Sequence, residues 1–498
     1  MRTPAKRSGR QPLPATLSAR LNGHVTLEAR ANGNLVARFD GISLALGKFS
    51  TAAVERSQEL RTSLPLASFT PPRRAIDKEI DLIVRRLAAR GLLEFHLAQS
   101  GRGQAQNGKT LLVIEPQAAD YWPRMPKLRD TESLALSRFA YMRRRADDLV
   151  LESPRARALF KICDPKIATA LATLSTPQQI EQLRGTAGFP GVELLALLVD
   201  CQILFQVDTA GGDNLRMAEG DDNLVLWDFH DLLFHARSTE GRHANPLGGA
   251  YMYAAAIAPL PAVRPSWPGE KIHLLKLSAP PADKISPAAT LLRERHSTRN
   301  FDHRRPITLA ELSYFLDSTA RVQATFTNTT SGSADEGPAL TYAPRPYPSG
   351  GGSYELELYL AVDKCEGLPR GFYHYDAGSH ALVALRVHPQ EFEAMLKGAQ
   401  FAMDAPGLPQ VLMTMTARFG RVSWKYTSIA YSLILKDVGV LMQTLYLMAA
   451  GMGLGGCAIG STNIDLFAKM TGIEFHVEGP VGVFALGRPA SSNTSDSD

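Results

Sequence analysis

The sequence has few cysteines, little excess charge and no long hydrophobic run, and each of these absences excludes a class of protein. Its four cysteines are Cys163, Cys201, Cys365 and Cys457, and no two of them form a C-x-x-C motif. A disulfide scaffold and a zinc finger are therefore excluded, and a reducing compartment is expected. The net charge of +5 over 498 residues is too small to indicate nucleic-acid binding by itself.

Membrane insertion and secretion are excluded in the same way. No uninterrupted apolar run reaches the roughly 20 residues that span a bilayer. The N-terminal stretch MRTPAKRSGRQPLP is basic, but no apolar segment follows it as in a secretory signal. We expect a cytoplasmic protein.

The composition that remains is typical of a folded protein, with 45% apolar and 21% charged residues. At roughly 100–200 residues per domain, the length predicts three or four domains. We expect the following parts: a flexible basic arm over 1–20, winged-helix-like units over 21–125 and 126–208, a linker with a connecting helix over 209–285, an α+β domain over 286–490 and a flexible tail over 491–498.

A repeated pattern predicts the two N-terminal units. HVTLEARANGNLVARF alternates apolar and polar residues around Asn32-Gly33, which predicts a β-hairpin. IVRRLAARGLLEFHLA predicts a helix that Gly91 ends and then a strand, and LLALLVDCQILFQVDT repeats this order. In the second unit, Thr176 and Pro177 are expected to begin another helix. Because the second repeated helix is almost wholly apolar, we expect peptide binding by strand addition rather than nucleic-acid binding.

The stretch over 209–222 is rich in Gly and Asp and predicts the first domain boundary, before a helix in LWDFHDLLFHARSTEGR. His230 and His235 of this helix are five residues apart, which is off the i,i+4 spacing that places two metal ligands on one face. We therefore expect one core-edge histidine, one surface histidine and no metal site. A Pro-rich connector, PLPAVRPSWPGE, leads to the last domain.

A basic cluster opens the last domain in LLRERHSTRNFDHRRPITLAELSYFL, ahead of a helix that Thr308 caps. Arg295, His296, Ser297 and Arg299 lie within five positions. Two guanidiniums with a hydroxyl between them suit a phosphate, because the guanidiniums donate bidentately and the hydroxyl fills a remaining acceptor. A solvated charged turn is the alternative.

A loop over 325–353, rich in Ser, Thr, Gly and Pro, is expected next, and it ends at a strand, YELELYLAV. Pro348, Ser349, Gly350 and Gly351 lie just before this strand. Glycines here let the backbone lie against a flat ligand, where a Cβ would collide. A flexible loop tip is the alternative.

Residues 428–450 predict a long apolar core helix in which Asp437 is nearly the only acid. GMGLGG follows this helix rather than a strand, so it is not a nucleotide-binding Rossmann turn. Its Gly455 and Gly456 are expected to let the backbone approach a cofactor closely. Lys425 and Tyr426 precede the helix and suit acid–base proton abstraction, although a Lys-Tyr pair is ordinary surface in most proteins.

Together these segments resemble the flavin-dependent nitroreductase superfamily. RHSTRNF is similar to its Arg-x-Ser-x-Arg phosphate motif, PSGGG to its loop under the isoalloxazine, and GLGGCAIG to its late flavin-contacting glycines. Arg488, in GRP, stands where the family often has another phosphate-binding basic residue. PSGGGSYELELYLAV, GFYHYDAGSHAL and WKYTSIAYSLILKDVG resemble the peptide dehydrogenases of thiazole/oxazole-modified peptide synthesis most closely.

The resemblance covers residues 223–490, where WDFHDLLFHARS is similar to the segment that leads into the oxidase domain of those dehydrogenases. Over 20–210 it is to winged-helix peptide-clamp domains found ahead of some family members. One departure is Gly352-Ser353-Tyr354-Glu355, where the family often has an Ala and a Leu-Tyr-Pro-like stretch. This departure affects the expected contacts with substrate more than those with flavin.

The resemblance implies an α+β fold with a central antiparallel or mixed sheet flanked by helices, FMN as cofactor, and a homodimer with each flavin at the interface. It implies Lys425 and Tyr426 as the catalytic pair for oxidation of thiazoline or oxazoline rings in a precursor peptide, with oxygen as electron acceptor. A separate cyclase is the expected partner. The alternatives are an NAD(P)H-dependent nitro or quinone reductase and a winged-helix binding protein with a non-catalytic flavin domain.

Overall fold

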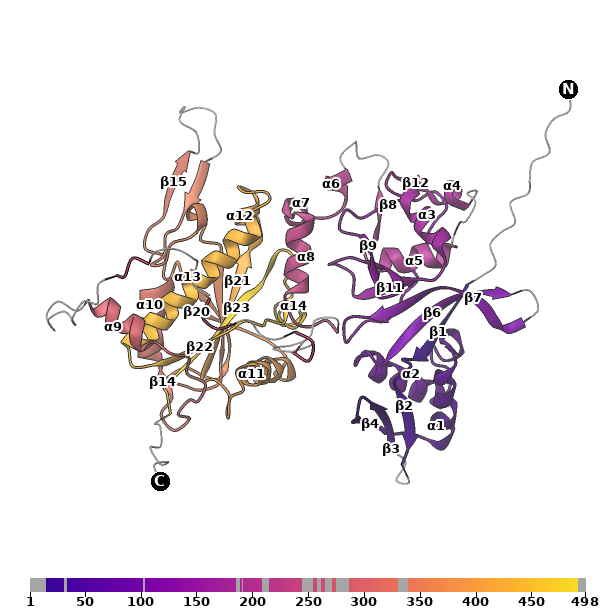
Figure 1. Ribbon diagram of the computed structural model, residues 1–498, viewed down its shortest axis with the longest axis horizontal. Helices are drawn as coiled ribbons and strands as arrows, with labels where there is room; N and C mark the ends of the chain where they lie inside the picture. Colours follow the sequence, from indigo (N-terminus) through magenta and orange to yellow (C-terminus); the bar gives the residue numbers. More distant parts are fainter. Residues whose placement is uncertain are drawn as a thin grey trace. The chain divides into compact units, whose positions relative to one another are not determined.

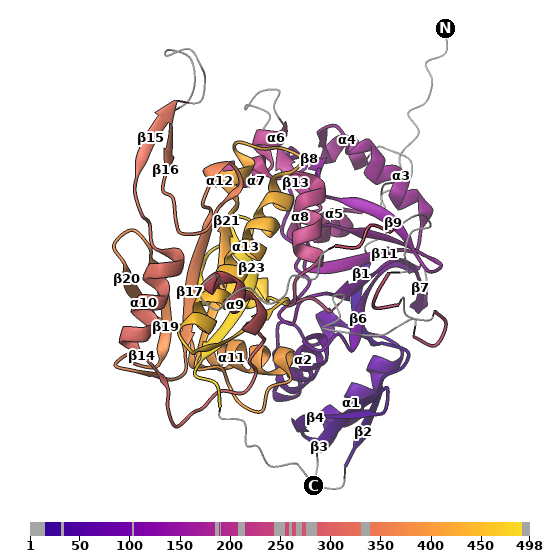
Figure 2. The same cartoon turned by 60° about the vertical axis from the view of Figure 1, so that its left-hand side comes forward.

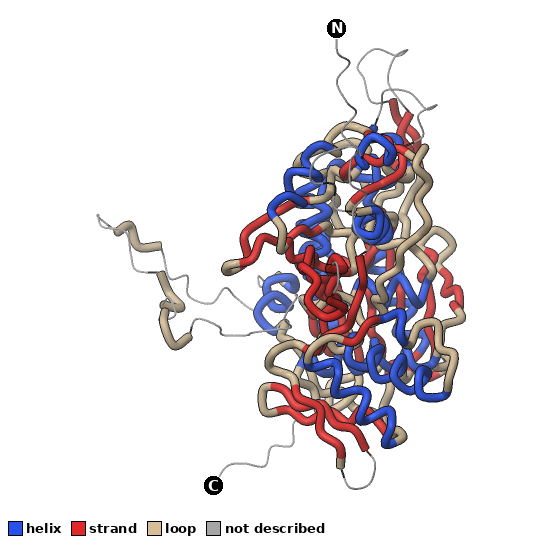
Figure 3. Tube along the Cα trace, turned by 90° about the vertical axis from the view of Figure 1, so that its right-hand side faces the viewer, coloured by secondary structure: helices blue, strands red, loops and turns tan. Residues whose placement is uncertain are grey.

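The computed structural model describes residues 15–30, 34–101, 104–184, 189, 191–207, 215–243, 254–257, 261–264, 271–274, 286–329 and 339–490. The chain divides into two compact units, residues 1–245 and 246–498. Each unit combines helices with strands, and the two kinds of element are intermingled along the trace (Figure 3).

The N-terminal unit is built mainly of antiparallel strands (Figure 1). Its strands are β1 (Ala15–Leu21), β2 (Thr26–Ala29), β3 (Asn34–Phe39), β4 (Ile42–Lys48), β5 (Leu64–Pro65), β6 (Leu93–Gly101), β7 (Gln104–Pro116), β8 (Ser133–Leu136), β9 (Tyr141–Arg145), β10 (Asp148–Glu152), β11 (Ala158–Ile162), β12 (Gln178–Gln179) and β13 (Leu204–Val207). Its helices are α1 (Thr51–Ser57), α2 (Ala75–Ala88), α3 (Pro165–Thr173), α4 (Ile180–Arg184), α5 (Val192–Asp200), α6 (Leu215–Ala218), α7 (Asp222–Leu226) and α8 (Phe229–Arg237). The sheets have the orders β5-β1-β6-β7-β11-β10-β9, β12-β8-β13 and β2-β3-β4.

One arrangement occurs twice in this unit. β1 pairs antiparallel with β5 on one side and β6 on the other, and β8 pairs in the same way with β12 and β13. The helix that precedes the last strand is α2 in the first set and α5 in the second. The predicted repeat of helix, short stop and strand is therefore confirmed, as is the β2–β3 hairpin. The winged-helix character of the two sets stays a prediction.

A single apolar core runs through both sets, from Leu17 to Leu204. In α2, Ile80, Val84 and Leu87 are fully buried at helical spacing, and each such side chain contributes about 1.5–3 kcal/mol. Gly91 follows α2 with a φ of +64°, a conformation that glycine adopts without the steric cost of a Cβ. The apolar spacing that predicts the helix is thus the spacing of the side chains on its buried face.

The predicted basic arm over 1–20 is too long. Ala15–Leu21 form β1, which pairs along its whole length with β6. Leu17 and Ala19 of this strand are buried in the core. Residues 1–14 and the predicted tail over 491–498 lie outside the described residues.

The helix start predicted at Thr176 and Pro177 is also wrong. The two residues after Pro177 form β12 against β8, and α4 begins only at Ile180. A cap of the expected kind occurs earlier, where Asp164 accepts from the Lys166 N–H ahead of α3. Pairing with β8 outweighs the local capping signal at Pro177.

The predicted boundary over 209–222 is part of the N-terminal unit, because the chain divides at residues 245 and 246. Residues 208–214 lie outside the described residues, and Leu215–Ala218 form α6. Glu219 is buried, accepts a hydrogen bond from the Ser137 hydroxyl and pairs with Arg138 at 3.2 Å. These contacts hold the stretch against the unit.

The two histidines of α8 lie as predicted, one in the core and one on the surface. His235 is fully buried and stacks on Trp227 at 5.8 Å between ring centroids, whereas His230 is exposed. Burial lowers the pKa of His235 to about 3, so its ring is neutral. Among the described residues, no group of three or more His, Cys, Asp or Glu could hold a metal ion.

The C-terminal unit has a central sheet between helices (Figure 1). Its strands are β14 (Ile307–Thr308), β15 (Phe326–Thr329), β16 (Ala339–Tyr342), β17 (Leu356–Val362), β18 (Cys365–Glu366), β19 (Gly371–Asp376), β20 (Ala381–Leu385), β21 (Val411–Arg418), β22 (Gly455–Ile459) and β23 (Glu478–Gly487). Its helices are α9 (Pro287–Glu294), α10 (Leu309–Ala320), α11 (Pro389–Met403), α12 (Phe419–Ser423), α13 (Ala430–Gly451) and α14 (Ile464–Thr471).

The sheet has the order β20-β19-β17-β21-β23-β22, and every neighbouring pair is antiparallel. Tyr359 and Ala361 of β17 lie on one face, in a core with Phe392 of α11 and Phe467 of α14. On the other face α13 packs so closely that a Cβ on Gly482 of β23 would meet its side chains. The predicted α+β fold, with an antiparallel sheet flanked by helices, is confirmed.

By length and composition, α13 is apolar enough to cross a membrane. Its buried residues, which include Ile434, Val438, Leu441 and Leu445, pack within the unit instead. The helix is therefore the core helix that the sequence predicts. It packs against β22, the strand that carries Gly455 and Gly456.

The loop predicted over 325–353 contains a hairpin that the sequence analysis missed. β15 and β16 pair antiparallel, and Phe326 stacks on Tyr342 with 5.5 Å between ring centroids. Figure 2 shows this pair extending away from the sheet as a two-stranded arm. Threonines and aromatics that favour strands outweigh the turn-forming residues around them.

Candidate functional site

The basic cluster at the start of the unit is held against β22. The Thr298 N–H donates to Gly456 O at 2.8 Å, and Ser297 forms a bridge with Gly456. The hydroxyls of Ser297 and Tyr446 lie 2.8 Å apart, and Tyr446 also accepts the Ala458 N–H at 2.8 Å. Segments 149 positions apart in sequence are thereby brought together.

Both arginines of the cluster are available to an anion. The Arg295 guanidinium lies over the Tyr446 ring at 4.8 Å, and Arg299 is exposed, with no hydrogen bond or ion pair to another described residue. Burial raises the pKa of the Cys457 thiol, and the positive charge of Arg299 opposes that rise. His296 Nδ1 lies 3.0 Å from Glu294 O on the surface. The guanidiniums of Arg295 and Arg299 and the Ser297 hydroxyl are therefore the groups that we expect to bind a phosphate.

Gly455 and Gly456 are needed for packing against the protein itself. A Cβ on Gly455 would lie 2.6 Å from Thr298, and one on Gly456 would overlap the Phe484 ring. The close backbone approach that the sequence predicts is real, but its partners are these two side chains. Contact of the same backbone with a cofactor stays a prediction.

Arg488 is already paired in this structure. Its Nη2 donates to both carboxylate oxygens of Glu311, at 2.7 and 2.8 Å. Glu311 is also the third residue of α10 and completes a capping box with Thr308, as the sequence predicts for that helix. The ion pair engages the group that was expected to bind phosphate, so that role stays a prediction.

The glycine loop, residues 348–351, is tied to the middle of α13. The Gly350 N–H donates to Asp437 at 2.8 Å, and the Ser349 hydroxyl donates to Asp437 at 2.9 Å. Gly351 has a φ of +61°, a left-handed conformation that favours glycine. The loop therefore has a fixed shape, unlike the flexible tip that was the alternative.

The same loop lies directly against Lys425 and Tyr426. Lys425 Nζ donates to Gly351 O at 3.0 Å and lies 5.3 Å from the centroid of the Tyr426 ring. A Cβ on Gly351 would overlap the Tyr426 hydroxyl and come within 2.9 Å of Lys425 Nζ. The three predicted features, the glycines, the lysine and the tyrosine, therefore form one cluster.

Both clusters lie along α13. Asp437 anchors the glycine loop and Tyr446 anchors the basic cluster, and nine residues separate them on the helix. At 1.5 Å per residue this places the two anchors ~13–14 Å apart along the helix axis. A molecule with a phosphate at one end and a flat ring at the other suits such an arrangement.

The sequence analysis did not predict one pair of buried acids near the site, Glu355 and Asp437. Glu355 has no exposed surface, Asp437 is 6% exposed, and both lie within 3.5 Å of the Ser349 hydroxyl. Asp437 was noted only as the rare acid of an apolar helix, and Glu355 only as a departure from the family pattern. An acid in an otherwise apolar helix was the available signal, because a buried carboxylate needs donors nearby.

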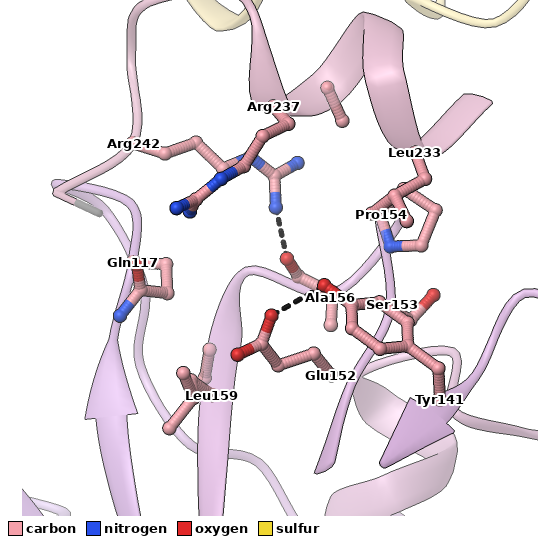
Figure 4. A pocket seen from close by; sticks show the side chains of 12 residues that line it. Gln117, Tyr141, Glu152, Ser153, Pro154, Ala156, Leu159, Leu233, Arg237 and Arg242 are labelled. Carbon is pink, nitrogen blue, oxygen red and sulfur yellow. Dashed lines mark hydrogen bonds between the residues drawn. The ribbon is translucent and has the colours of Figure 1, made fainter. Parts of the chain in front are cut away.

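A small open pocket lies in the N-terminal unit, between α8 and the strands β10 and β11 (Figure 4). Leu159 and Leu233 line its apolar part, and the Arg237 and Arg242 guanidiniums gather at one side. Arg242 donates to Ala156 O. This pocket was not predicted from the sequence, because its lining extends from Gln117 to Arg242, which are 125 positions apart.

Two family models match the chain. Residues 134–244 match the cyanobactin oxidase ThcOx model, and residues 292–488 match the nitroreductase family model. The first covers the second N-terminal repeat and the pocket, and the second covers both clusters along α13.

Individual proteins of known sequence or structure match part of the chain. A provisionally assigned nitroreductase of Methanocaldococcus jannaschii is 26% identical over 187 residues, which is 38% of this chain and 84% of that protein. A nitroreductase structure from Ralstonia eutropha covers 47% of this chain and 99% of its own, at 22% identity and a TM-score of 0.31. The E. coli microcin synthetase McbBCD complex with truncated pro-MccB17 matches 57% of this chain and 100% of its own, at 20% identity and a TM-score of 0.39.

The C-terminal unit is a nitroreductase-family domain, and the chain is an oxidoreductase. FMN is the cofactor of this domain. The chemistry of the basic cluster fits the phosphate of FMN, because two guanidiniums and a hydroxyl lie close together in Arg295, Ser297 and Arg299. The cyanobactin oxidase match on the same chain supports azoline oxidation in peptide biosynthesis as its reaction.

Proposed function

We propose that the chain oxidises thiazoline or oxazoline rings of a precursor peptide to thiazole or oxazole, with Lys425 and Tyr426 as the catalytic pair. The observation that carries this proposal is the contact of Lys425 and Tyr426 with the glycine loop. This contact supports the proposal, because it brings the proposed proton acceptor against the loop that is proposed to lie under the cofactor ring.

Aromatisation removes a proton from the former α-carbon of the azoline and a hydride from the neighbouring ring carbon. FMN, when bound, would supply the hydride acceptor, and molecular oxygen would be the final acceptor of the two electrons, leaving with two protons as hydrogen peroxide. Lys425 takes the ring proton, with Tyr426 assisting or exchanging roles with it. Arg295, Ser297 and Arg299 would hold the cofactor phosphate, with His296 beside them, and Pro348, Ser349, Gly350 and Gly351 would support its ring.

The surroundings of the pair suit a ring held within a peptide. Trp424 and Ile429, on the two sides of the pair in sequence, are 51% and 53% exposed. Apolar groups of this size next to a lysine offer a surface against which an azoline packs.

The N-terminal unit presents the peptide. The supporting observation is its pocket, where two guanidiniums beside leucine side chains suit a carboxylate next to an apolar residue of the substrate. A separate cyclase supplies the azoline and is the partner in the pathway.

We further propose that the protein is a cytoplasmic homodimer. All four cysteines are free thiols, which fits a reducing compartment. Leu435 and Leu447 of α13 remain partly exposed, and a second copy would cover them. Light scattering coupled to size exclusion reports the mass, and a monomer would contradict the proposal.

The catalytic assignment is tested with the double variant Lys425→Ala/Tyr426→Ala. It should bind FMN as the wild type does and form no azole from an azoline peptide. The matched control is Lys436→Ala/Tyr314→Ala, which removes an exposed lysine and an exposed tyrosine elsewhere in the unit. An active Lys425→Ala/Tyr426→Ala protein would overturn the assignment. Fast flavin reduction by NAD(P)H without any need for peptide would indicate a nitro or quinone reductase instead.

A further inference from the structure

Two carboxyl groups meet beneath the glycine loop. Glu355 immediately precedes β17, and Asp437 lies in the middle of α13. The Ser349 hydroxyl lies between them, 2.9 Å from Asp437 Oδ2 and 3.3 Å from Glu355 Oε2. Two buried charges this close repel each other and lose their hydration, so the pair favours a state with a single charge.

The donors around the pair satisfy one carboxylate and not two. The Gly350 N–H donates to Asp437, and the single proton of the Ser349 hydroxyl follows the shorter contact, also to Asp437. Glu355 Oε1 has no hydrogen-bond partner among the described residues. Glu355 therefore has weaker hydrogen bonding than Asp437, because its one side-chain donor among the described residues is the longer contact to Ser349 and its Oε1 has none.

A proton on Glu355 completes this hydrogen-bond chain. Ser349 Oγ has two lone pairs, and the Tyr354 N–H occupies one of them at 2.9 Å. The second accepts the O–H of a neutral Glu355 across the 3.3 Å contact. Every donor and acceptor of Ser349 is then used, and the remaining negative charge lies on the carboxylate that has two donors.

We propose that Glu355 and Asp437 share one proton, and that this acid pair positions the glycine loop beneath Lys425 and Tyr426. The two acids are positioning residues, because they act through Ser349 and Gly350 on Gly351, whose carbonyl accepts a hydrogen bond from Lys425 Nζ. Loss of the proton leaves two charges with donors for one, so the loop opens to water and Lys425 loses its contact. The role in turnover rests on the proposed function.

Charged and titratable groups from neighbouring elements also act on Glu355. They are Arg421 of α12, and Arg345 and Tyr347 from the segment before the loop. Burial, together with the negative charge of Asp437, raises the pKa of the Glu355 carboxyl to about 7, although hydrogen bonds from its own backbone and from Ser349 oppose the rise. The shared proton is thus retained in the acidic range and lost as the pH rises past neutrality.

Glu355→Gln tests the shared proton directly, because glutamine keeps the neutral shape at every pH. Infrared spectra of the wild type at about pH 6 should show the carbonyl band of a neutral carboxylic acid, and this band should vanish by about pH 9. It should be absent from Glu355→Gln and present in the control Glu366→Gln, which changes an exposed acid of β18. A wild type without the band, or a band that survives in Glu355→Gln, would overturn the shared proton.

The positioning role is tested by the pH dependence of azoline oxidation with FMN-loaded protein. Wild-type kcat should fall about tenfold from its maximum by about pH 8, with little change in KM, and Glu355→Gln should remove this fall. A fall that is unchanged in Glu355→Gln would overturn the role. If the wild type makes no azole at any pH, the proposed function fails, whereas the infrared result still decides whether the proton is shared.

Discussion

Replacing Gly351 with alanine tests whether the glycine loop and the Lys425–Tyr426 pair form one site. The φ of Gly351 is +61°, and its missing side chain leaves the space that the Tyr426 hydroxyl and Lys425 Nζ occupy. An added methyl group has no room unless those two groups move. Both are the ends of flexible side chains, so we expect them to shift while the backbone stays in place.

The magnitude follows from two separate costs. A left-handed residue with a Cβ costs about 1–2 kcal/mol, which lowers the melting temperature by roughly 2–8 °C for a domain of this size. Displacing the catalytic groups by about 1 Å costs on the order of 100-fold in turnover. We therefore expect a small loss of stability with a large loss of kcat.

Gly352→Ala is the matched control for Gly351→Ala. Gly352 has a φ of +68°, so the backbone cost is the same, but its Cβ would lie 3.2 Å from the Tyr342 ring and away from the pair. Differential scanning fluorimetry should give similar melting temperatures for the two variants, and azole formation should distinguish them. Equal turnover in both variants would refute the assignment of Gly351 to the same site as Lys425 and Tyr426.

Three further predictions concern cofactor, stability and substrate. Arg299→Ala should purify without its yellow flavin, because it removes an exposed guanidinium of the phosphate cluster, and flavin bound as in the wild type would contradict this. The raised pKa of Glu355 means that its stabilising proton is fully bound below about pH 4.5 and lost as the pH rises through about 7. Over that pH range, the free energy of unfolding should therefore fall by ~3 kcal/mol less in Glu355→Gln than in the wild type. Denaturant unfolding measures this difference, and equal falls in the two proteins would argue against it. Arg237→Ala should raise KM for an azoline peptide several-fold and leave kcat unchanged, and an unchanged KM would exclude the pocket as a peptide site.

The sequence predicted those parts of the fold that depend on local periodicity. The helices at 75–88 and 430–451 and the strand at 356–362 follow directly from the spacing of their apolar residues. The cap at Thr308 was predicted in the same way. Elements that depend on pairing with other strands were not predicted. β12 forms where a helix was expected to begin at Pro177, and β15 forms in a segment that was expected to be a loop.

The candidate site was predicted as a set of residues but not as a geometry. The motifs named Ser297, Gly351 and Lys425, yet only the fold shows that Tyr446 and Asp437 of α13 hold these segments. The contact between Glu355 and Asp437 was not predicted, because 82 positions separate the two acids and their segments were compared with the family one at a time. Tertiary packing alone brings them to the same hydroxyl.

The measurement that tests the central claim most directly is mass spectrometry of an azoline-containing peptide after incubation with the purified protein, FMN and oxygen. Our account predicts the loss of two hydrogens per ring, with formation of the azole and no loss in Lys425→Ala/Tyr426→Ala. A wild-type protein that binds FMN and leaves the azoline peptide unchanged would contradict the account.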